Sequence, residues 1–205
     1  IVGRRRRADR VGRACYAAAM ATRKTAARRK STPKHAYRLL VKLDGSEPPI
    51  WRLISVPGHM TLADLDRIIQ AAMGWTNSHM HLFAIDGNLY GAPDGEWIDD
   101  KPVLPDDAFT LDEVLGTSVP GFLHEYDLGD GWHHDVTVHA IELADEERNG
   151  WPMCLAGANA CPPEDVGGLG GYEEFLKAVS DPSHDEHDAM RRWCGGPFDP
   201  QGFDV

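Results

Sequence analysis

Two apolar segments followed at once by an amphipathic segment constrain the fold more than any other feature of the sequence. Residues 36–43 (AYRLLVKL) alternate between apolar and basic side chains, and residues 50–57 (IWRLISVP) form a second apolar run. Both patterns predict strands. Residues 61–75 (TLADLDRIIQAAMGW) predict a helix that is capped by Thr61 and ended by Gly74. The sequence therefore predicts an α+β fold in which this helix packs on a sheet.

The later segments extend the same pattern. Alternating residues predict a hairpin within 81–91 (HLFAIDGNLYG) and a second, longer one within 122–143. Short helices are predicted within 110–116, 172–182 and 183–196. A hairpin that leads into a helix packed on a mixed sheet is the opening of a β-grasp. We therefore expect a β-grasp-like (ubiquitin-like) mixed sheet with a packed helix, plus C-terminal helices.

Charge divides the chain into two parts. Residues 1–35 hold twelve Lys or Arg and a single acid, whereas the remaining 9 basic and 31 acidic residues give the rest a net charge of about −22. The basic segment has no apolar period, which predicts a disordered tail at 1–35 and one domain at 36–205. If Met20 is the true start, residues 1–19 are not translated; a start at Ile1 stays open.

This charge distribution limits the partners. An acidic body repels phosphate backbones, so any contact with nucleic acid is expected through the basic tail, and a protein partner is the other expectation. The sequence contains no run of 18 apolar residues, so no membrane span is predicted. The N-terminus lacks the apolar stretch of a secretory signal. Four cysteines make no disulfide framework in a chain of this size. We expect a reducing, cytoplasmic setting.

The segment 154–175 (CLAGANACPPEDVGGLGGYEEF) combines stiffness with chemistry. Two adjacent prolines fix an extended course, and Glu164 and Asp165 follow them directly. Cys154 and Cys161 are too far apart for a zinc knuckle. The structural alternative is that this segment only shapes the fold. It would then be a rigid loop whose carboxylates accept backbone hydrogen bonds and whose glycines allow close packing, followed by a helix that begins at Tyr172.

The end of the second hairpin (YDLGDGWHHD) is the other candidate. Asp130 and His134 lie there among further acids and histidines, and such groups bind divalent metals or transfer protons. The structural alternative is turn chemistry at Gly-Asp-Gly. If loop and hairpin converge, the predicted ligands of a divalent metal are Asp130, His134, Cys161 and Asp165. The predicted catalytic groups are His134, Glu164 and Asp165.

Two further expectations concern isolated residues. His79 and His81 (SHMHLF) are predicted to share a strand face, which is more typical of packing or of a surface pair than of metal ligation. Arg52 lies between Trp51 and Leu53 and is a candidate partner for the carboxylate of Asp127 or Glu164.

Several segments, taken together, resemble the plasmid pRiA4b ORF-3-like family, also described as passenger proteins of insertion elements. The resemblance rests on PPIWRLISVP, LADLDRIIQAAMGW with HMHLF, YDLGDGWHHDV, CPPEDVGGLGGYEEFLKAVSDP and the closing FDP, and spans residues 36–203. It implies a bacterial protein linked with plasmids and mobile elements. Members often carry cysteine after the Glu-Asp pair, where this chain has Val166, so any metal ligand at that position is missing here.

Three functions are then open. The first is an accessory or binding protein of mobile elements. The alternative is a metal-dependent enzyme of hydrolase type, with its site between the GDGWHH hairpin and the CPPED loop. The third, a DNA resolvase, gains little support from an acidic body whose seven serines lie in no recognisable nucleophile setting.

Overall fold

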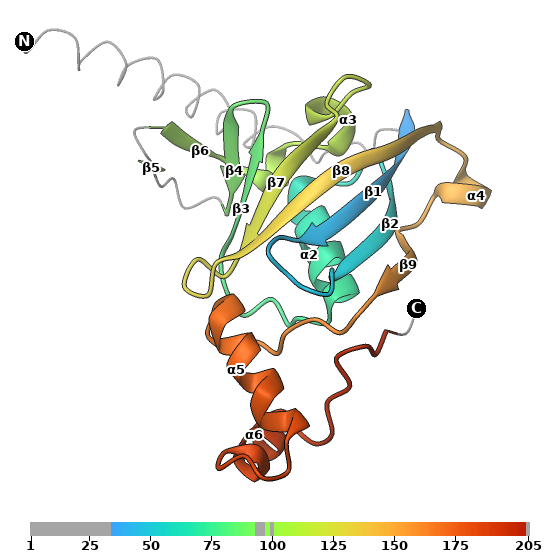
Figure 1. The fold of residues 1–205 in the computed structure, drawn as a ribbon. Helices are drawn as coiled ribbons and strands as arrows, with labels where there is room; N and C mark the ends of the chain where they lie inside the picture. The colour runs from blue at the N-terminus through green and yellow to red at the C-terminus, as the bar shows by residue number, and fades with distance from the viewer. Residues whose placement is uncertain (1–33, 93–96, 99–100, 204–205) are drawn as a thin grey trace, which may run out of the picture.

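The computed structural model describes residues 34–92, 97–98 and 101–203 of the chain (Figure 1). The predicted tail at 1–35 therefore lies almost wholly outside the described residues. None of the described helices is both long and apolar enough to cross a membrane. In chain order the elements are β1 (His35–Leu43), β2 (Trp51–Pro57), α2 (Leu62–Met73), β3 (His81–Ile85), β4 (Asn88–Gly91), β5 (Trp97–Ile98), β6 (Lys101–Pro105), the 3-10 turn η1 (Asp106–Ala108), α3 (Leu111–Val114), β7 (Gly121–Tyr126), β8 (Trp132–Leu143), α4 (Glu146–Asn149), β9 (Met153–Ala158), α5 (Gly168–Ser180) and α6 (His187–Trp193).

The strands form one mixed sheet in the order β5-β6-β4-β3-β7-β8-β1-β2-β9. Among the described strands, β4 and β6 form the one parallel pair. The long strand β8 pairs with β1 on one side and with β7 on the other, and so joins the two halves of the sheet. The α+β class and the mixed sheet are confirmed. The finer expectation of a β-grasp is not confirmed by this strand order, in which β1 has antiparallel neighbours on both sides.

Helix α2 covers one face of the sheet, behind β1, β2 and β8 (Figure 1). It begins with the predicted capping box between Thr61 and Asp64, and ends at Gly74 in the left-handed conformation. Its buried face carries the predicted period of apolar side chains, which join a core built from one face of the first hairpin and from β3, β7 and β8. Burial of each large apolar side chain contributes about 1.5–3 kcal/mol.

The two C-terminal helices form a separate layer beyond the ends of the strands, next to the β7–β8 turn (Figure 1). Aromatic rings hold this layer together: Phe175 of α5 contacts Trp193 of α6 at 5.9 Å and Phe198 of the C-terminal segment at 5.1 Å, between ring centroids. Helix α5 begins at Gly168, four residues before the predicted start at Tyr172. The glycines therefore form the first turn of the helix rather than a loop before it.

Arg52 joins four segments of the chain from a buried position. Its guanidinium donates hydrogen bonds to the carbonyl groups of Ala72 at the end of α2, of Trp51, of Ala158 and of Asn159, over 2.8–3.0 Å. The ring of Phe203 stacks 4.4 Å from it. The expected pair with Asp127 or Glu164 is thus wrong, because four of the five N–H donors of the guanidinium bind backbone carbonyl groups instead.

We predict that Arg52→Met lowers the free energy of unfolding by about 3 kcal/mol, because it leaves several buried carbonyl groups without donors. The matched control is Arg67→Met on the exposed side of α2, where loss of a surface ion pair with Asp64 costs less than about 1 kcal/mol. Urea denaturation of both variants measures the difference. Equal effects would contradict the role assigned to Arg52.

Candidate functional site

The acidic loop (residues 161–167) folds back onto the end of the β7–β8 hairpin. Trp75 Nε1 donates to the carbonyl oxygen of Pro162 at 2.9 Å, and the amide of Gly167 donates to Asp130 Oδ2 at 3.0 Å. A Cβ atom added at Gly168 would lie 2.6 Å from the carbonyl oxygen of Asp130. Glycine is therefore needed there for the loop and the hairpin to pack this closely.

Glu164 is the main anchor of the acidic loop. Its carboxylate accepts hydrogen bonds from the Tyr126 hydroxyl at 2.6 Å and from the Thr76 amide at 3.0 Å, and also from the hydroxyls of Thr76 and Ser78. Partial burial alone would raise the pKa of Glu164, but these donors hold it below its ordinary value. Burial and the Glu164 carboxylate raise the pKa of Tyr126 to about 12. Glu164 is thus an ionised acceptor for a neutral tyrosine, rather than a free acid or base.

Beside this anchor, three side chains from separate segments converge. His79 Nε2 lies 2.9 Å from Asp165 Oδ1 and 3.6 Å from Asp127 Oδ2. One potential ligand atom from each residue lies within 4.8 Å of the others. His79 precedes β3, Asp127 directly follows β7 and Asp165 belongs to the acidic loop. We call these three residues the His-Asp-Asp cluster.

The local backbone holds the two acids of the cluster in place. Asp127 and Asp165 both adopt positive φ, 54° and 59°, which non-glycine residues seldom do. Asp127 Oδ1 accepts from the amide of Gly129 at 2.9 Å, so its Oδ2 is left to face His79. The Asp165 side chain is 71% exposed, which leaves one side of the cluster open to solvent.

The chemistry of the cluster suits a divalent cation. An imidazole nitrogen and two carboxylate oxygens are ligands of zinc and manganese. His79 Nε2 is buried, and despite its proximity to Asp165 it makes no hydrogen bond of acceptable geometry. The two acids have positive φ, and the buried imidazole nitrogen of His79 faces both of them, so the three groups are able to ligate one ion.

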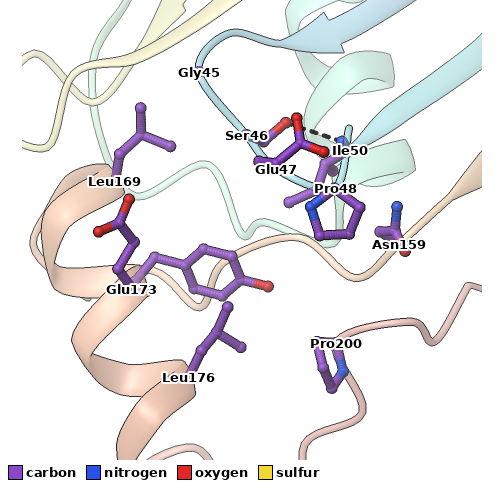
Figure 2. Close-up of a pocket in the computed structure, with 11 residues that line it drawn as sticks. Gly45, Ser46, Glu47, Pro48, Ile50, Asn159, Leu169, Glu173, Leu176 and Pro200 are labelled. Carbon is purple, nitrogen blue, oxygen red and sulfur yellow. Dashed lines mark hydrogen bonds between the residues drawn. The ribbon is translucent and has the colours of Figure 1, made fainter.

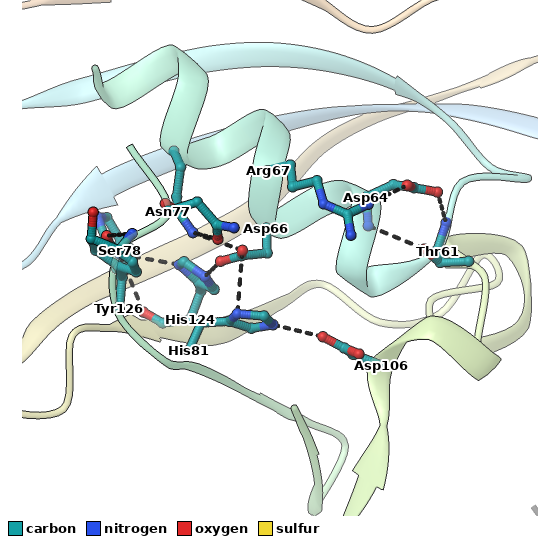
Figure 3. A network of polar contacts seen from close by, with 12 residues as sticks. Thr61, Asp64, Asp66, Arg67, Asn77, Ser78, His81, Asp106, His124 and Tyr126 are labelled. Atoms are coloured by element: carbon teal, nitrogen blue, oxygen red, sulfur yellow. Dashed lines mark hydrogen bonds and ion pairs between the residues drawn. The ribbon is translucent and has the colours of Figure 1, made fainter. Parts of the chain in front are cut away.

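A second polar network lies deeper, between α2 and the sheet (Figure 3). The buried Asp66 of α2 accepts from His124 Nε2 at 2.9 Å and lies 3.2 Å from His81 Nδ1. His81 Nε2 in turn lies 2.7 Å from Asp106. Burial opposes ionisation of Asp66, but the histidines outweigh it and lower its pKa. This network ties α2 to β3 and β7 from the interior.

The predicted site residues are thus divided. Asp165 belongs to the His-Asp-Asp cluster, and Asp130 and Glu164 lie close by but are used to hold the loop. His134 is fully buried, edge-on to Trp75 at 5.5 Å, with Nδ1 3.3 Å from His124 Nδ1. Cys161 Sγ lies 3.1 Å from Met73 Sδ, and burial raises the pKa of the thiol to about 12. Neither His134 nor Cys161 is part of the cluster.

Sequence reasoning did not place His79 at the centre of the cluster. His79 and His81 were predicted to share a strand face, but β3 begins at His81, and the two rings face different networks. The sequence signal for His79 was its place between the end of the helix and the strand, where functional side chains are common.

A pocket beneath the turn between β1 and β2 is a poor alternative site (Figure 2). It lies between Glu47 and Pro48 on one side and Tyr172 of α5 on the other. Its volume of about 70 Å³ is well below the 300 Å³ or more typical of small-molecule sites.

The fold and the cluster together define an α+β protein whose mixed sheet carries a loop-covered His-Asp-Asp site at one end. Residues 35–205 match the family described as plasmid pRiA4b ORF-3-like protein, and the chain belongs to that family. It is 41% identical over 158 residues to the "Uncharacterized protein y4hQ" of Sinorhizobium fredii, covering 77% of this chain and 80% of that protein.

A solved structure has the same fold. It is the crystal structure of the "Protein of Unknown Function MM3350" from Methanosarcina mazei Go1, with a TM-score of 0.75 and 34% sequence identity. The match covers 86% of this chain and 97% of the other. The predicted family is thus confirmed.

The buried histidines predict acid sensitivity. Burial holds the pKa of His134 well below its ordinary value, and the neighbouring His124 acts in the same direction. The unfolded chain therefore takes up a proton near pH 6.5 that the folded chain refuses, so stability is full above that pH and is lost as pH falls. We expect the free energy of unfolding to fall between pH 7.5 and 5.5, and His134→Phe to remove about 1 kcal/mol of that fall.

Urea denaturation at the two pH values measures this effect. His139→Gln, at an exposed position of β8, is the control and should leave the pH dependence as in the parent protein. The assignment fails if His134→Phe retains the full dependence.

The anchor predicts local opening of the acidic loop. Glu164→Ala removes the acceptor of the Thr76 amide, and releases the loop that places the Gly167 amide on Asp130. We expect these two amides to exchange with solvent about tenfold or more faster, which corresponds to a loss of about 1.4 kcal/mol of local stability. Hydrogen exchange followed by NMR gives the rates. Glu173→Ala, at an exposed position of α5, should not change them; unchanged rates in Glu164→Ala would contradict the anchor.

Proposed function

We propose that the protein binds a divalent metal cation through His79, Asp127 and Asp165, and that this centre supports metal-dependent chemistry of hydrolase type. The observation that carries the proposal is the convergence of three ligand atoms, from three separate segments, within 4.8 Å. Local sequence does not bring such atoms together, because it is the folding of the acidic loop over the hairpin that positions Asp165.

The ligand number favours a reactive centre over a purely structural one. Structural zinc sites use four protein ligands, whereas catalytic sites use three and leave a position for water or substrate. The exposed side of Asp165 supplies that open position. A cation held by these three residues would supply Lewis-acid chemistry, by lowering the pKa of bound water and polarising a substrate oxygen.

The surroundings support the proposal further. The groups that orient a ligand contribute to metal binding, and here they are a backbone amide and two side chains. The amide of Gly129 holds the Asp127 carboxylate. Glu164, which directly precedes Asp165, is held in place by its hydrogen bond from Tyr126. The ring of His79 packs edge-on against Tyr126 at 5.9 Å, which limits its rotation.

The assignment differs from the ligand set expected from sequence. Asp165 is retained, His79 and Asp127 replace His134 and Cys161, and Asp130 is assigned to the support of the loop. An accessory role on mobile elements, a protein partner and nucleic-acid contact through the basic tail stay predictions, as does a resolvase activity.

We predict that the purified protein binds about one equivalent of Zn²⁺ or Mn²⁺, and that metal at a hundredfold excess over Kd stabilises it by about 2.7 kcal/mol. His79→Ala should weaken binding at least about tenfold, because a ligand and its orienting contacts are lost. Isothermal titration calorimetry and thermal denaturation measure both effects.

His133→Ala is the matched control, since His133 lies on the β7–β8 hairpin next to the cluster but is exposed and faces Glu125. It should bind metal as the parent protein does. Binding of less than about a tenth of an equivalent, or equal affinity in His79→Ala, would remove the proposal.

A further inference from the structure

A groove between the acidic loop and the two C-terminal helices adjoins the proposed metal centre. We call it the α5–α6 groove. Its volume is about 310 Å³, which is within the range of ligand-binding clefts. Asp165 lines this groove and also belongs to the His-Asp-Asp cluster, so the groove and the centre share a wall. The lining residues are Asp165, Val166, Gly171, Glu174, Phe175, Glu186, Met190 and Trp193.

The floor of the α5–α6 groove is apolar and aromatic. Phe175 is 2% exposed and belongs to the core, whereas Trp193 is 48% exposed although its ring contacts Phe175 edge-on. Met190 adds a flexible thioether side chain beside them. A large ring left half open to solvent in a groove offers a surface on which an extended aliphatic chain or a planar cation packs.

The rim of the groove is acidic. Asp165, Glu174 and Glu186 come from the loop, from α5 and from the start of α6 respectively, and no Lys or Arg lines the groove among the described residues. Glu174 is neutralised in part by Lys177, 2.6 Å away on the outer side of α5. Asp165 faces His79, and Glu186 makes no ion pair with a Lys or Arg within the part of the chain that the structure describes. Carboxylates around an aromatic floor attract a cation with an apolar stem.

We propose that the α5–α6 groove binds the side chain of an arginine in a peptide, and that the adjoining peptide carbonyl faces the metal centre. The aliphatic stem would pack on Phe175 and Met190, and the guanidinium would stack on Trp193 between the carboxylates. Glutamate would be repelled by the rim, and a neutral side chain would leave the Glu186 carboxylate without a counter-charge. This inference rests on the proposed function, because it names the class of substrate that the centre would act on.

The test uses three peptides that differ at one side chain. They are acetyl-Gly-Arg-Gly-amide, its isostere with citrulline, which is uncharged, and its analogue with glutamate. Titration of each into the full chain, followed by ¹H–¹⁵N NMR, gives the affinities and the amides that shift. We expect the arginine peptide to bind about tenfold tighter than the citrulline peptide, and the glutamate peptide to show no binding.

Two variants test whether the peptide binds in the α5–α6 groove. Trp193→Ala should weaken the arginine peptide about five- to tenfold, which is the size of a partly desolvated cation–π contact. Glu186→Gln should reduce the preference for arginine over citrulline and leave the fold intact. Glu147→Gln, an exposed acid of α4, is the matched control and should change neither value. Equal binding of the arginine and citrulline peptides, or full affinity in both groove variants, overturns the inference.

Peptide titrations with and without Zn²⁺ distinguish this inference from the metal proposal. If both hold, Zn²⁺ tightens the arginine peptide in the parent protein and not in His79→Ala. Arginine-selective binding that Zn²⁺ leaves unchanged supports the groove and contradicts the shared site. Zn²⁺ binding without any preference for arginine supports the metal centre and overturns the groove.

Discussion

The site depends on the hydrogen bonds that Tyr126 and Thr76 donate to the Glu164 carboxylate. Hydrogen bonds to an ionised acceptor contribute about 1.5–3 kcal/mol each, and this carboxylate accepts from a hydroxyl at 2.6 Å and an amide at 3.0 Å. They hold the acidic loop on the hairpin and so fix the backbone of the next residue, Asp165. Loss of these bonds would leave the loop held by the Trp75–Pro162 and Gly167–Asp130 hydrogen bonds alone, and would let Asp165 move away from His79.

Local patterns predicted most of the secondary structure and the family. Alternation placed β1, β2 and the two hairpins, and the capping box placed the start of α2 at Thr61. The strand β6 was not predicted, because its proline-containing sequence has no alternation and its pairing with β4 is a contact between distant segments. Strand order likewise depends on such contacts, which explains why β8 between β1 and β7 could not be derived from periodicity.

The candidate site shows the same limit at the level of single residues. Sequence reasoning found the loop and the hairpin end because proline, glycine and acids are dense there. It could not say which acids are used for shape and which remain free, since that depends on donors elsewhere in the chain. Glu164 finds its donors at Thr76 and Tyr126, and Arg52 finds carbonyl groups rather than a carboxylate. The alternation in β8 correctly predicted that His134 points to the buried face, and this burial keeps His134 away from the cluster.

A crystal structure of the protein with Mn²⁺, measured at the manganese absorption edge, tests the central claim most directly. The account predicts an anomalous peak about 2.0–2.3 Å from His79 Nε2 and from one carboxylate oxygen each of Asp127 and Asp165, with Glu164 still bound to Tyr126. A peak coordinated by Glu164 or His134, or crystals at saturating metal with no peak at the His-Asp-Asp cluster, would contradict it.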